Sequence, residues 1–335
     1  MPPVVSVDPK EPDPAVIAEA VRVLRRGGLV AFPTETVYGL GASAFDARAV
    51  DRVFAAKGRP PTHPLIAHVL DSGEARALAA SWSQLASMLA GAFWPGPLTM
   101  IVDRGEQVPA AVSGGADSIA LRVPSHPVAR ALIAALGAPI AAPSANRYQG
   151  LSPTLAAHVV KGLGDAVDLV LDGGPCDAGV ESTVVDVRAG EARVLRPGAV
   201  SLARLRHVAA VERGGGETVG DGAPRASPGM DARHYAPRAR LLVAETWQEA
   251  RRMADGLASS GQRVGLVVHS REGTAAADGV VVRWLPSDPA EYARLIYRTL
   301  HELDDAGVDA IVAQAVPDDE AWWAVADRLE RAASF

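Results

Sequence analysis

Two cations close together in one loop are the first feature of this sequence that suggests chemistry. Lys57, Gly58 and Arg59 precede a Pro-rich stretch that ends near His63. The planar fork of Arg59 and the point charge of Lys57 suit neighbouring phosphate oxygens. Cations are also favoured at a helix C-terminus by the helix dipole. This loop is therefore either a triphosphate clamp or a helix cap.

A polar turn follows the apolar segment that ends at Phe32, and loops at strand ends are where α/β proteins bind ligands. The turn carries three hydroxyls and then two glycines, namely Thr34, Thr36, Tyr38, Gly39 and Gly41. The hydroxyls suit a small polar substrate, and the glycines predict a close approach of backbone to ligand. An ordinary turn with a threonine cap explains the same residues.

Arg122 lies near the end of a buried-looking apolar segment, 118–123. A buried guanidinium without an anion is costly. The partner of Arg122 is therefore either a carboxylate of the protein or the carboxylate of a substrate, bound through two parallel hydrogen bonds.

Further polar side chains follow later strands. Ser144 and Asn146 follow the strand predicted at 139–142, and Ser152 is expected to cap the next helix, whose N-terminus also attracts phosphate. Ser182 and Arg196 flank the last two strands of this half. No Cys-His or Ser-His-Asp arrangement accompanies these residues, which favours binding and charge stabilisation over covalent catalysis.

Alternating helical and extended patterns must position these residues. Helices are predicted near 14–26 and 48–56, and strands at 29–32, 64–70, 98–103, 118–123, 139–142, 167–171, 183–187 and 193–195. This pattern predicts an α/β fold with one large, twisted, mixed sheet.

The amino-acid composition changes after this first half. The expected organisation is a catalytic domain over 1–211, a Gly- and Pro-rich linker over 212–239 that closes over the site, and a small Rossmann-like α/β domain over 240–335. The small domain lacks a glycine-rich fingerprint after its first strand, so nothing marks it as a dinucleotide binder.

Composition excludes several classes of protein. At 335 residues, with 48% hydrophobic and 21% charged residues, the chain is expected to fold as two globular domains. It lacks a run of about 18 apolar residues and a signal-peptide pattern, so a cytoplasmic protein is expected. The single cysteine, Cys176, excludes a thiolate zinc site, and the net charge of −6 argues against a large non-specific grip on nucleic acid.

A series of motifs in one order resembles the YrdC-like family over about residues 15–210. They are PTETVYGL (33–40), KGRP (57–60), PLI (64–66), WPGPLT (94–99), RVP (122–124), PSAN (143–146), ST (182–183) and RPG (196–198). The rest of the chain resembles the longer, two-domain members of this family, the threonylcarbamoyl-AMP synthases. The features that carry this resemblance are SPGM (227–230), HYAP (234–237) and the second α/β pattern.

The resemblance implies a nucleotidyltransferase. Its substrates would be L-threonine, bicarbonate or CO2, and ATP, and its products threonylcarbamoyl-AMP and pyrophosphate, with Mg²⁺ bound through the ATP phosphates rather than by a protein cage. The product would pass to a separate transferase complex that modifies tRNA, so neither tight tRNA binding nor a membrane is expected.

The resemblance also implies roles for individual residues. The threonine positions are Thr36, His68, Arg122, Ala142 and Ser182. The ATP positions are Lys57, Arg59, His63, Ser118, Ser144, Asn146, Ser152, Arg196 and Tyr235, and the expected catalytic set is Lys57, Arg59, Ser144 and Asn146. Tyr235 is expected to reach back over the nucleotide, although 231–233 departs from the family pattern.

Two other functions compete with this one. Carbamoyl transfer in hydrogenase maturation uses a related domain, but that chain needs zinc-finger cysteines, which a single cysteine excludes. A double-stranded RNA-binding module is the alternative from another class, and salt-sensitive RNA binding without ATP turnover would favour it.

Overall fold

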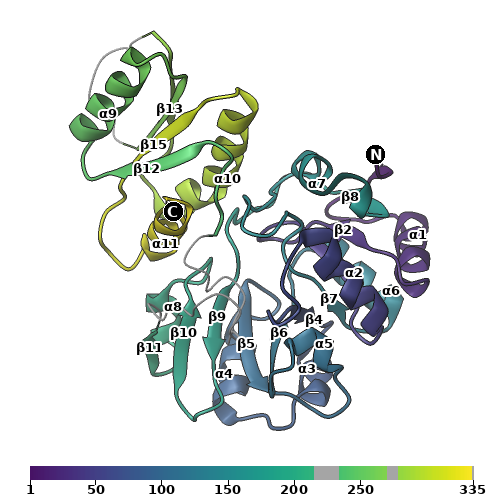
Figure 1. Cartoon of the computed structure of the whole chain (residues 1–335). Coiled ribbons are helices and arrows are strands. Elements are labelled where there is room, and N and C mark those ends of the chain that lie inside the picture. The colour runs from purple at the N-terminus through teal and green to yellow at the C-terminus, as the bar shows by residue number, and fades with distance from the viewer. Residues whose placement is uncertain (215–233, 270–277, 334–335) are drawn as a thin grey trace. The chain divides into compact units, whose positions relative to one another are not determined.

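The computed structural model describes residues 1–214, 234–269 and 278–333. They form two compact units, one of residues 1–148 and 152–214, the other of residues 149–151 and the described residues from 234 onward (Figure 1). Most of the predicted linker, 212–239, lies outside the described residues. Its first two residues belong to a strand, β11 (Val211–Arg213).

The first unit is built on a sheet of eleven strands in the order β1-β8-β2-β3-β7-β4-β6-β5-β9-β10-β11. The strands are β1 (Val4–Ser6), β2 (Val30–Phe32), β3 (Gly39–Ser43), β4 (Ile66–His68), β5 (Leu98–Asp103), β6 (Ser118–Arg122), β7 (Ile140–Ala141), β8 (Leu169–Asp172), β9 (Thr183–Asp186), β10 (Ala192–Arg196) and β11. Because β4 and β6 are parallel while β5 and β6 are antiparallel, the predicted mixed sheet is confirmed.

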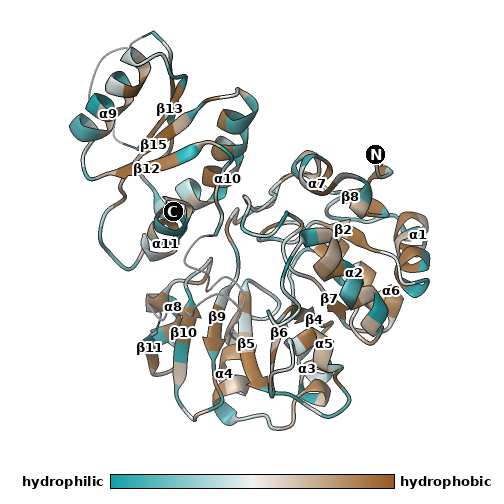
Figure 2. Cartoon of the chain, viewed as in Figure 1, coloured by the Kyte–Doolittle hydropathy of each residue, from teal (hydrophilic) through white to brown (hydrophobic). Residues whose placement is uncertain are grey.

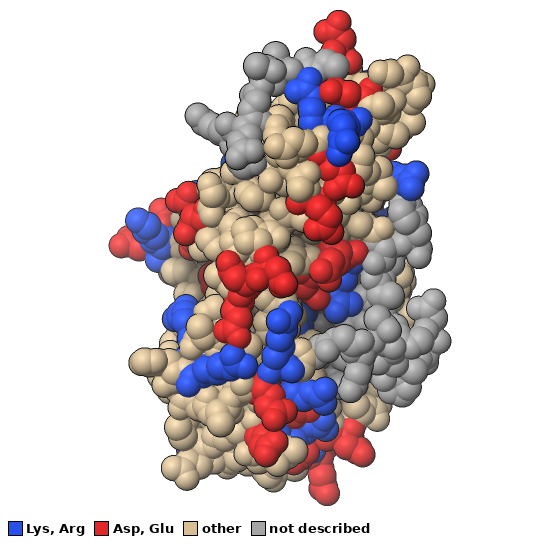
Figure 3. Space-filling model, turned by 90° about the vertical axis from the view of Figure 1, so that its left-hand side faces the viewer, with Lys and Arg blue, Asp and Glu red and all other residues tan. Residues whose placement is uncertain are grey.

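Helices surround this sheet, and their caps agree with their sequences. They are α1 (Pro14–Arg25), α2 (Ala47–Lys57), α3 (Ser72–Leu78), α4 (Gln84–Phe93), α5 (Ala110–Ser113), α6 (Pro127–Leu136), α7 (Ala156–Leu163) and α8 (Leu202–Arg206), with a 3-10 turn at Gly164–Ala166. The Asp46 side chain accepts from two backbone amides at the start of α2. In Figure 2 the strands are mainly hydrophobic while the helices carry both kinds of residue. On the face drawn in Figure 3, basic and acidic side chains are intermixed.

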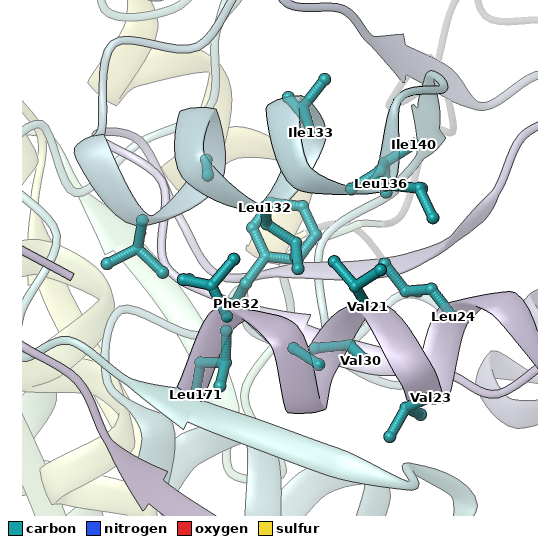
Figure 4. Close-up of a cluster of buried hydrophobic side chains, with 14 of the residues drawn as sticks. Val21, Val23, Leu24, Val30, Phe32, Leu132, Ile133, Leu136, Ile140 and Leu171 are labelled. Carbon is teal, nitrogen blue, oxygen red and sulfur yellow. The ribbon is translucent and has the colours of Figure 1, made fainter. Parts of the chain in front are cut away.

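The apolar faces of α1 and α6 meet over the sheet (Figure 4). Val21 and Leu24 of α1 belong to one buried cluster with Leu132 and Leu136 of α6 and with Phe32 of β2. Burial of each such side chain contributes about 1.5–3 kcal/mol. This cluster fixes β2, and therefore the start of the polar turn that follows Phe32.

The second unit has a four-stranded parallel sheet in the order β12-β15-β13-β14. Its elements are β12 (Arg240–Ala244), α9 (Trp247–Ser259), β13 (Val264–Val268), β14 (Val280–Trp284), α10 (Pro289–Asp305), β15 (Ala310–Gln314) and α11 (Trp323–Ala333). Helix α9 supplies the crossover connection from β12 to β13, and helix α10 supplies the one from β14 to β15. The predicted small Rossmann-like domain is confirmed. No helix in the described ranges combines the length and the apolar character needed to cross a membrane.

Candidate functional site

A row of buried polar residues crosses four neighbouring strands of the large sheet. The row consists of His68 (β4), Arg122 (β6), Thr99 (β5) and Ser182, which directly precedes β9. An apolar cluster lies two residues away from this row in the same strands, and its members are Ile66, Ala120, Ile101 and Val184. Residues two apart in a strand share a face. The polar row therefore lies on the same face of the sheet as this apolar cluster, directly beside it, because of strand register.

Arg122 has a carboxylate partner within the protein. Its Nη2 lies 2.7 Å from Oε1 of Glu35, with side chains only 4% and 9% exposed, and its Nη1 donates to Thr36 Oγ1 at 2.8 Å. Burial alone would raise the pKa of Glu35, but the charge of Arg122 and the other polar groups around the carboxylate together outweigh burial and hold that pKa below its ordinary 4.5. The carboxylate partner left open by the sequence is therefore Glu35.

The Glu35 and Arg122 pair leaves hydrogen-bonding capacity unused. Although the charges touch, the N–H directions miss the carboxylate, and neither Glu35 oxygen nor Arg122 Nη2 has a well-directed partner among the described residues. The same is true of Nδ1 of His68. Burial, helped by the charge of Arg122, lowers the pKa of His68 to about 3, so its imidazole is neutral. Buried polar groups normally find partners, so these atoms have unused capacity to bind the polar groups of a small ligand.

Lys57 is buried at the end of α2. Gly58 follows in the left-handed conformation, φ 64°, which ends the helix and starts the loop. The Lys57 ammonium donates to the backbone oxygens of Ser144 and Asn146, each at 2.5 Å. Burial lowers the pKa of Lys57 well below 10.5, as does the charge of Arg59, whereas Glu181 acts in the opposite direction. Three of the four expected catalytic residues thus lie together.

The fourth expected catalytic residue, Arg59, lies beside the same loop. Its Nη2 donates to the backbone oxygen of Pro64 at 3.2 Å. The ring of Tyr148 lies 6.0 Å from its guanidinium and 5.6 Å from the ring of His63.

Ser118 begins β6 and Arg122 ends it, so about 13 Å separates their Cα atoms. His63 precedes β4, the parallel neighbour of β6, and His68 ends β4. His63 and Ser118, two predicted ATP positions, thus lie at the amino ends of these strands. His68 and Arg122, two predicted threonine positions, lie at their carboxyl ends.

Two further predicted positions lie near this row. The amide of Ala142 donates to the Ile66 backbone oxygen at 2.9 Å, which fixes Ala142 beside β4. Arg196 Nη2 donates to the backbone oxygen of Ser182 at 2.9 Å and to its hydroxyl at 3.1 Å. Thr99 Oγ1 lies 2.7 Å from the same hydroxyl.

The predicted helix cap at Ser152 is wrong. Helix α7 begins at Ala156 after Leu155, with no side-chain cap bond. The Ser152 hydroxyl lies 2.5 Å from a carboxylate oxygen of Glu181, to which it donates. The serine is thus held by a buried acid distant in sequence, and the phosphate-attracting helix N-terminus predicted at this position is absent.

The two glycines after Phe32 have a packing role in the structure, and their predicted close approach to a ligand stays a prediction. A Cβ on Gly41 would lie 2.6 Å from Cε1 of Phe32 and 2.8 Å from a methyl of Ile140, so this glycine allows β3 to pack between β2 and β7. A Cβ on Gly39 would lie 3.3 Å from that of Ala142. Both glycines serve contacts within the protein.

All three hydroxyls predicted to bind substrate have partners within the protein. Tyr38 donates to the Gly174 backbone oxygen at 2.7 Å, and Thr34 donates to that of Val37 at 2.6 Å. Thr36 is the hydroxyl of this turn that reaches Arg122.

Sequence reasoning missed three polar residues of the site. Glu35 and Glu181 stand inside or beside the motifs, each next to a residue that was selected, and a count of charges in those motifs would have found them. Thr99 gives no comparable signal, because only the pairing of β5 with β9 in the folded sheet brings its hydroxyl to that of Ser182.

Tyr235 lies in the second unit. Its backbone has φ 61°, and its ring lies 5.9 Å from that of Tyr297 and 4.7 Å from the Arg328 guanidinium. Residues 231–233, where the sequence departs from the family pattern, lie outside the described residues. The contact of Tyr235 with a nucleotide stays a prediction.

The fold and the site define a class. The protein is a two-domain α/β protein whose larger sheet buries a row of hydroxyls, a neutral imidazole and cations suited to small charged ligands.

Comparison with protein families refines this class. The family model described as "Telomere recombination", which groups Sua5, YciO and YrdC proteins, matches residues 22–198, and the model "Threonylcarbamoyl-AMP synthase, C-terminal domain" matches residues 200–334. The chain belongs to the two-domain threonylcarbamoyl-AMP synthase family.

Individual relatives agree along nearly the whole chain. The threonylcarbamoyl-AMP synthase of Pyrococcus abyssi is 40% identical over 94% of this chain and 93% of its own length, and that of Bacillus subtilis is 38% identical over 95% and 92%. A crystal structure of P. abyssi Sua5 complexed with L-threonine is similar with a TM-score of 0.88 and 38% identity, covering 98% of this chain and 97% of that one.

Proposed function

We propose that this chain makes L-threonylcarbamoyl-AMP from L-threonine, bicarbonate or CO2, and ATP, with release of pyrophosphate. The observation that carries the proposal is the pairing of two sites in one unit. One is the row around Arg122, and the other is the cluster of Lys57, Ser144 and Asn146. Family membership and the threonine complex of the P. abyssi relative support it.

The row around Arg122 suits an amino acid. The threonine carboxylate would bind the guanidinium of Arg122, which already donates to Thr36. The negative charge of Glu35 beside this position favours the ammonium of a zwitterion. Because the His68 imidazole is neutral, it adds hydrogen bonds without adding charge. Thr36, Ser182 and the backbone at Ala142 would complete the pocket.

The reaction itself asks for positioning and charge stabilisation. The threonine amine takes up CO2 as a carbamate, one carbamate oxygen attacks the α-phosphorus of ATP, and pyrophosphate leaves. Arg59 and Arg196 would neutralise the charge on the phosphates, with Ser144, Asn146, His63, Ser118 and Ser152 around the nucleotide. Each charge-assisted hydrogen bond of this kind contributes about 1.5–3 kcal/mol.

Magnesium fits the phosphate end as a ligand of ATP. Its preferred ligands are oxygens, and it commonly retains several waters while binding phosphates. Near Lys57 the chain offers the buried carboxylate of Glu181 and the amide oxygen of Asn146, without a cluster of three acidic or histidine residues among the described parts. When bound, the ion would neutralise the developing charge of the leaving pyrophosphate.

The remaining roles concern the linker and the fate of the product. Tyr235 would cover the bound nucleotide, and the product would pass to a separate tRNA-modifying transferase complex. Tight binding of tRNA by this chain is not required. The net charge of −6 is consistent with this.

The decisive test is mass spectrometry of the purified protein with ATP, isotopically labelled threonine and labelled bicarbonate. We expect an adduct that contains both labels and AMP, together with one pyrophosphate per adduct. Omitting threonine should abolish pyrophosphate release. Hydrolysis of ATP that does not depend on threonine, with no labelled adduct, would contradict the proposal.

A further inference from the structure

Lys57 makes several hydrogen bonds to the segment 142–148, and binding a phosphate would not by itself require them. Its ammonium lies 2.5 Å from the backbone oxygens of Ser144 and Asn146 and 3.4 Å from the side-chain oxygen of Asn146. Its own backbone oxygen accepts from the amide of Tyr148 at 2.8 Å. One residue therefore bonds the segment at three positions.

The number of donors matches the number of acceptors. An ammonium has three N–H groups, whereas a neutral amine has two, and three oxygens surround the Lys57 nitrogen. In this arrangement the three N–H groups of Lys57 are directed at oxygens of the chain, so none is left for a phosphate.

The segment depends on Lys57 along one side. On the other side, the amide of Leu40 donates to the Pro143 oxygen and the amide of Ala145 donates to the Tyr38 oxygen, both at 2.8 Å. These backbone bonds survive any change of side chain. The bonds to Ser144 O and Asn146 O do not, because they come from the lysine side chain.

We propose that Lys57 is a positioning residue, whose ammonium fixes the segment 142–148 and thereby links the amino-acid end of the site to the phosphate end. The proposal rests on the proposed function, since Ala142 is a predicted threonine position while Ser144 and Asn146 are predicted ATP positions. A residue that acts only by touching phosphate affects nucleotide binding alone. A residue that fixes this segment also affects threonine binding when no nucleotide is present.

Calorimetric titration separates these two roles. In Lys57→Met, we expect threonine binding without nucleotide, and binding of a non-hydrolysable ATP analogue without threonine, each to weaken by about ten-fold or more. Lys57→Arg keeps the charge but cannot place one nitrogen among three oxygens, so we expect it to restore neither. Lys10→Met is the matched control, because Lys10 is exposed, and both affinities should stay at the wild-type value.

Unchanged threonine affinity in Lys57→Met, with weakened binding of the ATP analogue, would overturn the proposal. If the wild-type protein itself fails to bind threonine, the proposed function fails instead, so the two failures are distinguishable.

Should Lys57→Met not fold, Lys57→Ala with added ethylammonium gives the answer, because the ion supplies the missing donors to the three oxygens. Threonine binding that returns with ethylammonium, but not with ethanol or potassium chloride, supports the proposal. Absence of rescue contradicts it.

Discussion

Two buried cations of the first unit are compensated in different ways. The charge of Arg122 lies against the carboxylate of Glu35. The charge of Lys57 is surrounded by peptide and amide oxygens, with no carboxylate at ion-pair distance among the described residues. Carbonyl dipoles solvate a cation but do not cancel its charge, whereas a carboxylate does.

This difference matches the two ligands of the proposed reaction. An amino-acid zwitterion carries no net charge, and the neutral pair of Arg122 and Glu35 offers it one group of each sign. A triphosphate carries several negative charges, and the charge of Lys57, which has no carboxylate at ion-pair distance among the described residues, raises the local positive potential for it. Arg196 resembles Lys57 in donating to a backbone oxygen, that of Ser182.

Arg122→Met should have the largest effect on both stability and activity. It leaves the buried carboxylate of Glu35 without a cation, which costs about 3–5 kcal/mol of unfolding free energy. It also removes the carboxylate contact, so threonine-dependent pyrophosphate release should fall by at least about 100-fold. Urea unfolding and a pyrophosphate assay measure the two effects. The double variant Glu35→Gln/Arg122→Met should recover part of the stability, and a single variant as stable as the wild type would refute the pairing.

Glu35→Gln should cost less, up to about 3 kcal/mol at neutral pH, because the amide keeps a polar oxygen beside the buried guanidinium. The pH dependence gives the sharper test. The folded pKa of Glu35 lies below 4.5, so acidification protonates the unfolded chain first, and the stability due to Glu35 is lost as the pH falls below about 4.5. Unfolding at a series of pH values should show a flatter acid limb in the variant. An identical limb would mean that Glu35 is not held ionised by Arg122.

Thr99→Val should have the smallest effect. Valine keeps the shape of threonine and removes the bond to the Ser182 hydroxyl, while the Arg196 bond to that hydroxyl remains. We expect a loss of about 1 kcal/mol of unfolding free energy and a modest rise in the KM for threonine. A variant with unchanged stability and KM would show that Thr99 is only a neighbour of the site.

The sequence predicted regular elements that carry a clear local pattern and missed those without one. Strand β5 was predicted with its observed limits, 98–103, because a short apolar run that follows turn residues is typical of a buried strand. Strand β3 was read as a polar turn, since its glycines suggested a loop. Those glycines are required by packing against Phe32 and Ile140, which no local pattern reveals.

By itself, the sequence determined the fold class, the family and most of the polar residues from which the site is built, because motifs, their order and periodicity can be read directly along the chain. The tertiary structure decided which polar groups become partners of one another. Glu35 lies beside Arg122, Glu181 beside Ser152, and the Lys57 ammonium among the oxygens of Ser144 and Asn146. These pairings depend on strand register and loop packing between segments far apart in the chain, and in a buried site electrostatic energy depends on distances in space.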